Sequence, residues 1–279
     1  MYAALVEPLP LAGAAVMPRV KPAMESRLTA LLRDESPWMA PALNRVAEQI
    51  GLRLWSGQPW LKFPPLLLVG PPGAGKSHLA RRLGELSGCG SAIVSVAGAY
   101  SAAEIAGNPR GFKHPQPCIA ACTMQGTRTA NPIIIVDEVD KASPNSGGDP
   151  VNALLNMLEP STSDRHFDGC LGAEIDLSQV NWILTANALA RLPASLLSRV
   201  DIVEVRGPGP EHAEPLLAQV WRSVAHSLGM PPPALPPLEP RAEEALLRLF
   251  RRTRSVRRVR RAVEATIAVS VRQYARQPN

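Results

Sequence analysis

Two short segments of the chain carry the residue types that bind a magnesium-bound nucleoside triphosphate. Residues 70–77 read Gly-Pro-Pro-Gly-Ala-Gly-Lys-Ser, and two carboxylates, Asp137 and Glu138, follow an apolar run later in the chain. Glycines let the backbone curve around a phosphate with its N–H groups pointing inward. Lys76 is expected to reach the β- and γ-phosphates, and the Ser77 hydroxyl is expected to bind Mg²⁺. Together the segments predict a site that binds and hydrolyses a nucleoside triphosphate.

The elements on either side of residues 70–77 are those that such a loop requires. The apolar run Leu66–Val69 predicts a buried strand before the loop, and Ser77–Leu86 predicts a helix after it. The positive end of the helix dipole then faces the phosphates. A chance glycine-rich turn is the alternative, and the complete pattern in this context argues against it. The predicted nucleotide-binding residues are Gly70, Pro71, Pro72, Gly73, Ala74, Gly75, Lys76, Ser77 and His78.

The second segment predicts the catalytic carboxylates. Ile133–Val136 is a run of four β-branched residues, typical of a strand that is buried on both faces of a parallel sheet. Asp137 is expected to hold Mg²⁺ through water, together with Ser77, and Glu138 to orient and polarise the attacking water. An Asp-Glu pair could also cap a helix, so its position downstream of a phosphate loop is what favours catalysis.

Strand and helix patterns alternate over the first two thirds of the chain, which predicts an α/β fold. We expect a parallel five-stranded sheet sandwiched by helices, with ligands at the carboxyl ends of the strands. The expected strands are Leu66–Val69, Ala92–Val96, Ile133–Asp137, Trp182–Thr185 and Ile202–Val205. The helices expected between them include Ser77–Leu86, Ile119–Gln125 and Pro150–Leu158.

Beyond Gly207-Pro208-Gly209-Pro210 the pattern changes to helices alone. The expected helices are Glu211–Leu228, Arg241–Phe250 and Val256–Tyr274. The predicted organisation is an arm over residues 1–40, a nucleotide-binding α/β domain over residues 41–206 and a small all-helical lid over residues 207–279.

Composition excludes several classes of protein. The chain is 46% hydrophobic and 19% charged, and no apolar run reaches the roughly 18 residues that span a membrane. The apolar stretch Ala3–Val20 is interrupted by three prolines, which favours a flexible arm over a signal peptide. Four cysteines lack metal-ligand spacing, so reduced thiols and a cytoplasmic location are expected.

The net charge of +6 is concentrated in one short segment. Seven arginines lie between Arg251 and Arg261, so the rest of the chain has a formal charge of −1. A solvated or inter-subunit face is one interpretation of this segment. Binding of a nucleic-acid phosphate backbone is the other.

Four segments resemble the AAA+ ATPases, and within that superfamily the ATPase module of Lon proteases. They are LLLVGPPGAGKSHLA from Leu66, NPIIIVDEVDKAS from Asn131, GGDPVNALLNMLEP from Gly147 and IDLSQVNWILTANALARLPASLLSRVDIVEV from Ile175. The resemblance runs from about Pro41 to the C-terminus and implies ATP and Mg²⁺ as cofactors.

The resemblance also implies roles for three further polar residues. Asn187 matches the sensor-1 residue that positions the attacking water, with a plain strand-end cap as the alternative. Arg199 falls where the family carries the arginine finger that reaches the nucleotide of a neighbouring subunit, although the preceding residue is Ser198 instead of an acid. Arg257 matches sensor 2, which contacts the nucleotide from the lid, and Arg254 or Arg258 could serve instead. Together with Lys76, the predicted catalytic residues are Glu138, Asn187 and Arg199.

Two weaker expectations concern aromatic residues. Phe112 lies where the Lon module has a pore loop that grips unfolded polypeptide, and a buried loop anchor is the alternative. Trp38 and Met39 precede the first strand and are expected near the adenine.

The resemblance therefore favours a Mg²⁺-dependent ATPase that assembles into a homo-oligomeric ring, a hexamer, and remodels or unfolds a protein partner. The protease domain of Lon has no counterpart in the sequence, so a stand-alone motor without its own proteolysis is expected. Membrane association is not expected. The alternatives are a nucleic-acid-handling ATPase of the clamp-loader or helicase-loader type, and a nucleotide-switched scaffold.

Overall fold

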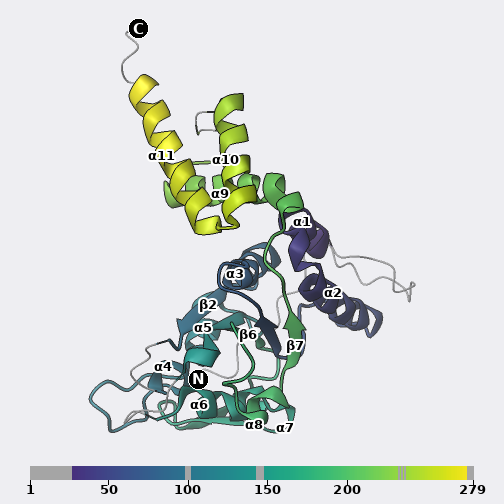
Figure 1. Ribbon diagram of the computed structural model, residues 1–279. Helices are drawn as coiled ribbons and strands as arrows, with labels where there is room; N and C mark the ends of the chain where they lie inside the picture. Colours follow the sequence, from purple (N-terminus) through teal and green to yellow (C-terminus); the bar gives the residue numbers. More distant parts are fainter. Residues whose placement is uncertain are drawn as a thin grey trace. The chain divides into compact units, whose positions relative to one another are not determined.

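The computed structural model describes residues 27–97, 102–142, 148–231, 233, 235 and 237–274 (Figure 1). The chain divides into two compact units. The first unit contains the described residues up to Ala30 and those from Pro41 to Val205. The second unit contains Leu31–Ala40 and the described residues from Arg206 onward.

Five parallel strands form the sheet of the first unit, in the order β2-β3-β6-β1-β7. In the register of the sheet, Leu66 lies beside Ile183 on one side and Asp201 on the other. The predicted five-stranded parallel sheet is confirmed, with strand ends that differ from the prediction by at most one residue. The strands are β1 Leu66–Val69, β2 Ser91–Ser95, β3 Ile133–Asp137, β6 Asn181–Ala186 and β7 Asp201–Glu204.

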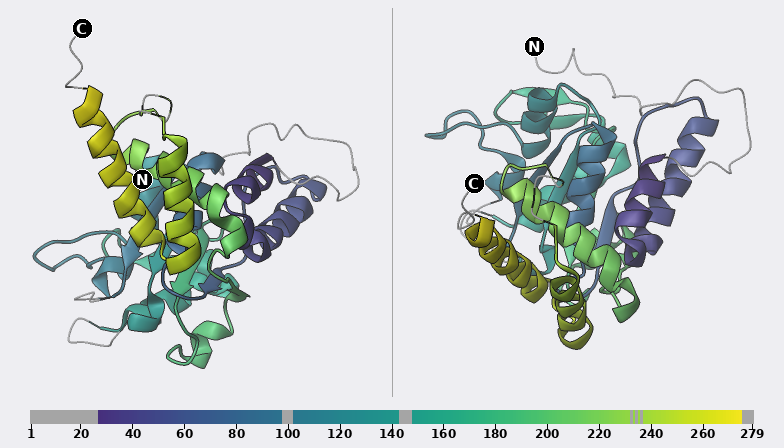
Figure 2. Two further views of the ribbon diagram at one scale, coloured as in Figure 1. Left: turned by 45° about the horizontal axis from the view of Figure 1, so that its top comes forward. Right: turned by 90° about the horizontal axis from the view of Figure 1, so that it is seen from above.

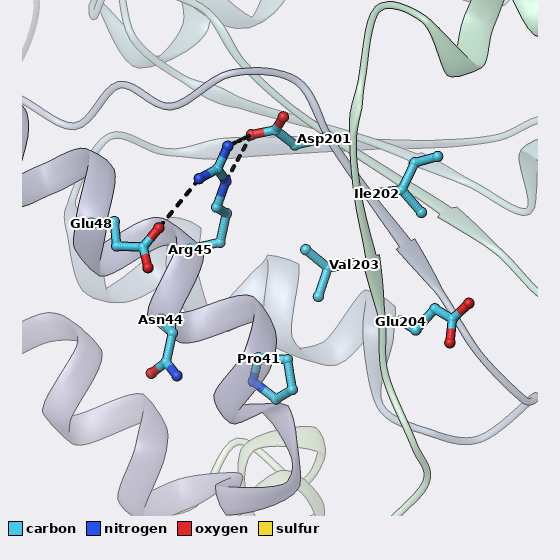
Figure 3. A pocket seen from close by; sticks show the side chains of 8 residues that line it. All are labelled: Pro41, Asn44, Arg45, Glu48, Asp201, Ile202, Val203 and Glu204. Atoms are coloured by element: carbon cyan, nitrogen blue, oxygen red, sulfur yellow. Dashed lines mark hydrogen bonds and ion pairs between the residues drawn. The ribbon is translucent and has the colours of Figure 1, made fainter.

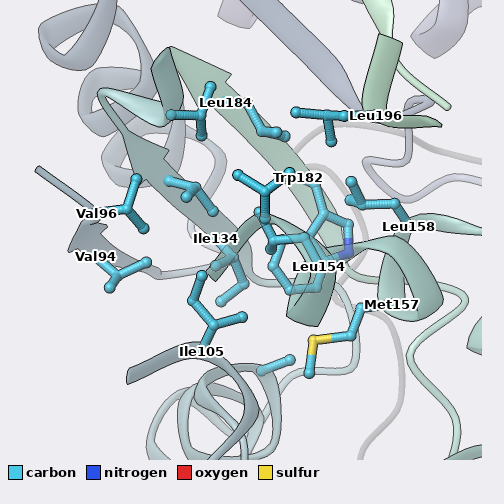
Figure 4. Packing of buried hydrophobic residues seen from close by; sticks show 14 of the residues in the cluster. Val94, Val96, Ile105, Ile134, Leu154, Met157, Leu158, Trp182, Leu184 and Leu196 are labelled. Carbon is cyan, nitrogen blue, oxygen red and sulfur yellow. The ribbon is translucent and has the colours of Figure 1, made fainter. Parts of the chain in front are cut away.

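Both faces of the sheet are covered by helices. Successive side chains of a strand point to opposite faces, so each strand contributes apolar side chains to both sides. On one face, Trp182 of β6 packs in a buried cluster with Leu154 and Met157 (Figure 4). On the other face, α3 contacts β2, β3 and β6. The covering helices are α3 Lys76–Ser87 and, on the face of Trp182, α4 Ala103–Ala106, α5 Ile119–Thr127, α6 Pro150–Leu158 and α8 Ala194–Leu197.

Several short elements of the first unit were not predicted. Strands β4 His166–Asp168 and β5 Ala173–Ile175 form an antiparallel hairpin between α7 Pro160–Ser163 and β6. The 3₁₀ helix η2 Val139–Lys141 follows β3 directly. These segments are too short for a periodic pattern to reveal them.

The described part of the predicted arm over residues 1–40 is helical. Helix α1 spans Arg27–Glu35, the 3₁₀ helix η1 spans Pro37–Met39, and α2 continues over Ala40–Trp55. The side chains of Leu32 and Met39 are each only 1% exposed. Packing of this apolar face explains why the segment is ordered. Residues 1–26 lie outside the described residues.

The second unit is helical, as predicted. After Arg206 its described helices include η3 Pro210–His212, α9 Ala213–Ser227, α10 Pro240–Thr253 and α11 Val256–Tyr274, and Figure 2 shows the last three from two sides. Val259, Val263 and Ile267 are buried at a spacing of four residues, which gives α11 one apolar face. Ser36 contacts α9 in this unit: its hydroxyl accepts a hydrogen bond from Gln219 Nε2 at 3.0 Å. None of the described helices is both long and apolar enough to span a membrane.

Candidate nucleotide-binding site

The loop between β1 and α3 needs glycine at three positions for two different reasons. Gly73 and Gly75 have φ angles of +82° and +98°, which side chains other than glycine rarely adopt. A Cβ atom at Gly70 would lie 2.1 Å from the carbonyl oxygen of Val205. Gly75 is the N-cap of α3 and supplies no side-chain hydrogen bond, so no N-cap side chain occupies the place where an anion could meet this end of the helix.

Lys76 and Asn187 come together although they are far apart in the sequence. Lys76 Nζ donates to Asn187 Oδ1 at 3.2 Å, to the carbonyl oxygen of Gly70 at 2.6 Å and to that of Pro71 at 3.2 Å. Burial lowers the pKa of Lys76, whereas the nearby carboxylate of Asp137 opposes this shift. The ammonium group is therefore held by neutral oxygen atoms in a partly desolvated site, where an added phosphate would interact strongly with it.

Ser77 and Asp137, the predicted metal-binding residues, are in direct contact. The hydroxyl of Ser77 donates to Asp137 Oδ1 at 2.7 Å. Among the described residues there is no group of three or more His, Cys, Asp or Glu side chains that could hold a metal ion. A cation here would therefore take its other ligands from water and phosphate oxygens, which is how Mg²⁺ binds in nucleotide sites.

Thr185 is a member of the site that the sequence analysis missed. Its hydroxyl donates to Asp137 Oδ1 and accepts a hydrogen bond from the backbone N–H of Glu138 at 3.1 Å. Thr185 is 1% exposed and lies on β6, which ends at Ala186, directly before Asn187. The signal that could have revealed Thr185 in the sequence is its hydroxyl group, two positions before the predicted sensor residue Asn187.

Glu138 occupies an unusual backbone position at the end of β3. Its φ angle is +59°, in the left-handed region, which costs a non-glycine residue about 1–2 kcal/mol. Although Glu138 precedes η2 as its N-cap residue, its side chain makes no capping hydrogen bond, so the alternative of a simple helix cap is not supported. The carboxylate instead forms an ion pair with Lys141.

The other predicted residues of the loop differ in exposure. Pro71 and Pro72 are exposed, Ala74 is buried, and His78 is half-buried on α3. Pro71, Pro72 and Ala74 bring no charged group to the loop. Their role toward a nucleotide stays a prediction.

Arg199 lies just after α8 and is held within the first unit. Its Nε atom is 2.9 Å from Glu159 Oε2, and Nη1 donates to the carbonyl oxygen of Ser195 at 2.7 Å. Within the described part of the chain, no contact joins Arg199 to Lys76 or Asp137. This is compatible with a residue that acts on a different subunit, which stays a prediction.

The candidates for sensor 2 lie in the second unit. Arg257 and Arg258 are exposed in the first turn of α11. Arg254 ends α10 with a φ angle of +50°. The choice among these three arginines stays a prediction.

Phe112 lies at the tip of an exposed loop. Its side chain is 63% exposed, which rules out the alternative of a buried anchor. Asn108 and Gln116 close the loop by a backbone bridge, and Arg110 donates to the carbonyl oxygens of Cys170 and Leu171 in the β4–β5 turn. That hairpin carries a second exposed aromatic residue, Phe167, which is also 63% exposed and which the sequence analysis missed.

Trp38 and Met39 are both buried in the second unit, at 7% and 1% exposure. The ring of Trp38 lies 5.6 Å from that of His212. Their expected place near the adenine stays a prediction.

A cavity of about 410 Å³ lies elsewhere in the first unit, between α2 and the edge strand β7 (Figure 3). Arg45 crosses it and pairs with Asp201 at 2.8 Å and with Glu48 at 3.3 Å. Both carboxylates raise the pKa of Arg45. The charges lining the cavity are thus largely paired with each other, and none of its lining residues belongs to the phosphate loop.

The residues of the site fit a magnesium–triphosphate complex. A cationic Nζ, a helix N-terminus without a side-chain cap and glycines with positive φ suit the phosphates, and the touching oxygens of Ser77 and Asp137 suit the cation. When bound, the complex would supply an electrophilic phosphorus atom. Lys76 would neutralise charge there, and Ser77 and Asp137 would hold the cation.

Comparison with known proteins agrees with this geometry. The sequence model of the ATPase family associated with various cellular activities (AAA) matches residues 66–207. Lon protease 2 of Herpetosiphon aurantiacus is 37% identical over 164 residues, which are 59% of this chain and 20% of that protein. Lon protease of Clostridium acetobutylicum is 32% identical over 181 residues, which are 65% of this chain and 23% of that protein. The chain thus spans about a fifth of the length of the curated relatives it matches.

A solved structure shows the same fold. A closed-state reconstruction of Hsp104 with ATPγS and FITC casein superposes with a TM-score of 0.55 over 71% of this chain and 38% of that chain, at 16% identity. The family match covers half of the chain and includes both the phosphate loop and Asp137. This chain therefore belongs to the AAA family of ATPases and is similar to the ATPase part of Lon proteases.

Proposed function

We propose that this protein is a Mg²⁺-dependent ATPase that assembles into a homohexameric ring and remodels or unfolds a protein partner. The observation that carries the proposal is the cluster at the carboxyl ends of β1, β3 and β6. There, Lys76 contacts Asn187 at 3.2 Å and Ser77 contacts Asp137 at 2.7 Å. In an open parallel sheet this edge is where ligands bind.

In this proposal each residue of the site has a separate role in ATP hydrolysis. Glu138 accepts a proton from the attacking water, and the amide of Asn187 holds that water in line. Lys76 and Arg257 stabilise the negative charge on the phosphates. Arg199 completes the site of the next subunit, which makes assembly a condition for turnover.

Two exposed aromatic residues support action on a polypeptide. Phe112 lies on a loop that contacts the β4–β5 hairpin through Arg110, and Phe167 lies on β4 of that hairpin. Aromatic side chains bind extended chains through large apolar contacts. The proposal assigns no proteolytic step to this chain, although its relatives are Lon proteases by name. The cytoplasmic location stays a prediction.

Steady-state ATP hydrolysis measured against protein concentration tests the proposal. A specific activity that rises with concentration is expected, because the site is completed by a second subunit. A constant rate per chain would exclude Arg199 as a residue that acts in trans. In the same assay, Glu138→Gln is expected to lower turnover about 10²–10⁴-fold while ATP still binds.

The second candidate function is nucleic-acid handling, which one observation favours. Six exposed arginines have no acidic partner in the described part of the chain; we call this set the arginine-rich surface: Arg251, Arg252, Arg254, Arg257, Arg258 and Arg261. It covers the last turn of α10 and the first turns of α11. Salt-dependent binding of DNA that disappears when Arg258, Arg260 and Arg261 are neutralised would support this function over protein remodelling.

A further inference from the structure

Glu159 connects two helices and has a well-defined backbone. Its own N–H bonds to the carbonyl oxygen of Leu155 at 3.2 Å, which ends α6. Its carbonyl oxygen accepts from Thr162 at 3.1 Å and from Ser163 at 2.9 Å, in the turn of α7. The backbone that carries the Glu159 carboxylate is therefore fixed by hydrogen bonds to both α6 and α7.

Arg199 is held in a corresponding way after α8. Its N–H bonds to the carbonyl oxygen of Leu196 at 3.0 Å, and its Nη1 donates to the carbonyl oxygen of Ser195 at 2.7 Å. Nε lies 2.9 Å from Glu159 Oε2 without a well-aligned hydrogen bond, so this contact is chiefly an ion pair. Among the described residues, Nη2 has no partner.

We propose that Glu159 is a positioning residue for Arg199. The carboxylate fixes one edge of the planar guanidinium, Ser195 fixes a second position, and Nη2 is left to meet a phosphate oxygen of a neighbouring subunit. This inference rests on the proposed function, because it assumes that Arg199 acts in trans. It adds a residue to which neither the phosphate loop nor the strand-end motifs point.

The physical reason lies in the length of the arginine side chain. Arginine has many rotamers, and ordering them only when the nucleotide arrives would cost conformational entropy at that moment. A charge partner that orders the guanidinium beforehand removes part of this cost, and small misplacements of a catalytic group have large effects on rate.

The same contact contributes little to folding. The side chains of Arg199 and Glu159 are 29% and 33% exposed, and ion pairs with such exposure add little stability. Loss of the contact is therefore expected to change turnover far more than the melting temperature. This separates positioning from a structural role.

A double-mutant cycle in the full-length protein tests the proposal. Arg199→Ala is expected to lower kcat about 10³-fold or more, and Glu159→Gln about tenfold, with ATP affinity changed less than about twofold. Adding Glu159→Gln to Arg199→Ala should cause no further loss, because the carboxylate then has no arginine to position. Glu85→Gln is the matched control: Glu85 forms an ion pair with Arg82 at 2.6 Å with comparable exposure, and turnover should not change.

The outcomes separate this proposal from the proposed function. If Arg199→Ala leaves turnover unchanged, the prediction that Arg199 is an arginine finger is wrong. If Arg199→Ala is inactive while Glu159→Gln retains full turnover, only the positioning role is overturned. A rise in turnover in Glu159→Gln, or an equal loss in both backgrounds, also overturns it. Thermal melting of each variant identifies loss of folding, and Glu159→Asp, which keeps the charge, should then recover part of the activity.

Discussion

The nucleotide site of the first unit and the arginine-rich surface of the second unit both concentrate positive charge, but they hold it differently. Lys76 is 7% exposed, and three oxygen atoms accept hydrogen bonds from its ammonium group. The six arginines of the surface are exposed and have no described acidic partner. A buried and oriented charge is specific for a ligand of one geometry, whereas exposed charges act through a field that salt screens.

The difference extends to the neighbouring residues. At the nucleotide site, Thr185 is a buried hydroxyl that links Asp137 to the backbone of Glu138. Beside the arginine-rich surface, Arg260 pairs with Glu264 at 3.0 Å, whereas its neighbour Arg261, a member of the surface, has no such pair among the described residues. The first region should therefore respond strongly to single substitutions, and the second only to the removal of several charges.

The largest effect is expected for Lys76→Ala. Loss of the ammonium group removes the charge that meets the β- and γ-phosphates, so turnover should fall by about 10³-fold or more, along with ATP affinity. Equilibrium binding of a fluorescent ATP analogue and steady-state hydrolysis measure both quantities. Arg81→Ala, an exposed cation on the same helix, is the control and should behave like the parent protein. Equal losses in both variants would contradict a specific role for Lys76.

A second, half-buried cation, Lys62, sharpens the comparison through its pH dependence. Burial lowers the pKa of Lys62 to about 8, and its Nζ donates to the carbonyl oxygen of Val180 at 2.7 Å. The unfolded chain keeps this proton up to a pH of about 10.4, so the unfolded state binds more protons over this range. Stability of the parent protein relative to Lys62→Met should therefore rise between pH 8 and pH 10, by at most about 3 kcal/mol.

Urea unfolding of both proteins at pH 7, 8, 9 and 10 measures this difference. Arg53→Met is a useful comparison, because the positive charge of Arg53 also lowers the pKa of Lys62, so its removal should make the rise in stability with pH smaller. A stability difference that is independent of pH in the Lys62→Met pair would mean that Lys62 keeps its ordinary pKa.

A smaller effect is expected for Thr185→Val. The substitution keeps the shape but removes the hydrogen bonds to Asp137 and to the N–H of Glu138. Stability should fall by about 1–3 kcal/mol, since partners in a partly buried site lose their bonds. Turnover should fall about tenfold, because Asp137 and Glu138 lose a common anchor. Thr185→Ser retains the hydroxyl and should keep most of the activity; a loss in Thr185→Ser as large as in Thr185→Val would point to packing instead.

The smallest effect on stability is expected at the arginine-rich surface. Replacing Arg252, Arg258 and Arg261 by Gln together should change the free energy of unfolding by no more than about 0.5 kcal/mol, because each side chain is exposed. Any gain should shrink at high salt, since it would come from relief of repulsion. Urea unfolding at 50 mM and 500 mM NaCl provides the measurement. A large loss of stability would show that this surface is a structural interface after all, and the contrast with the nucleotide site would fail.

Much of the fold could be predicted because its signals are local. Residues 133–136 form a continuous apolar run, and β3 is indeed a central strand with both faces buried. The phosphate loop could be predicted from its glycines, and two of them have left-handed φ angles that other residue types rarely adopt. The hairpin β4–β5 and the helices of residues 27–39 were missed, because short strands and an interrupted helix leave little periodicity.

The candidate site shows the same division between local and distant information. Lys76, Ser77 and Asp137 lie in motifs, and the sequence by itself determined their chemistry: a cation, a hydroxyl and a carboxylate beside a glycine-rich turn. Only the tertiary structure decided that Thr185 bonds to Asp137, that Glu159 pairs with Arg199, and that the β4–β5 hairpin contacts the Phe112 loop. The reason is physical: a motif fixes residue types along one stretch of backbone, whereas these contacts join segments that meet only when parallel strands and their covering helices pack.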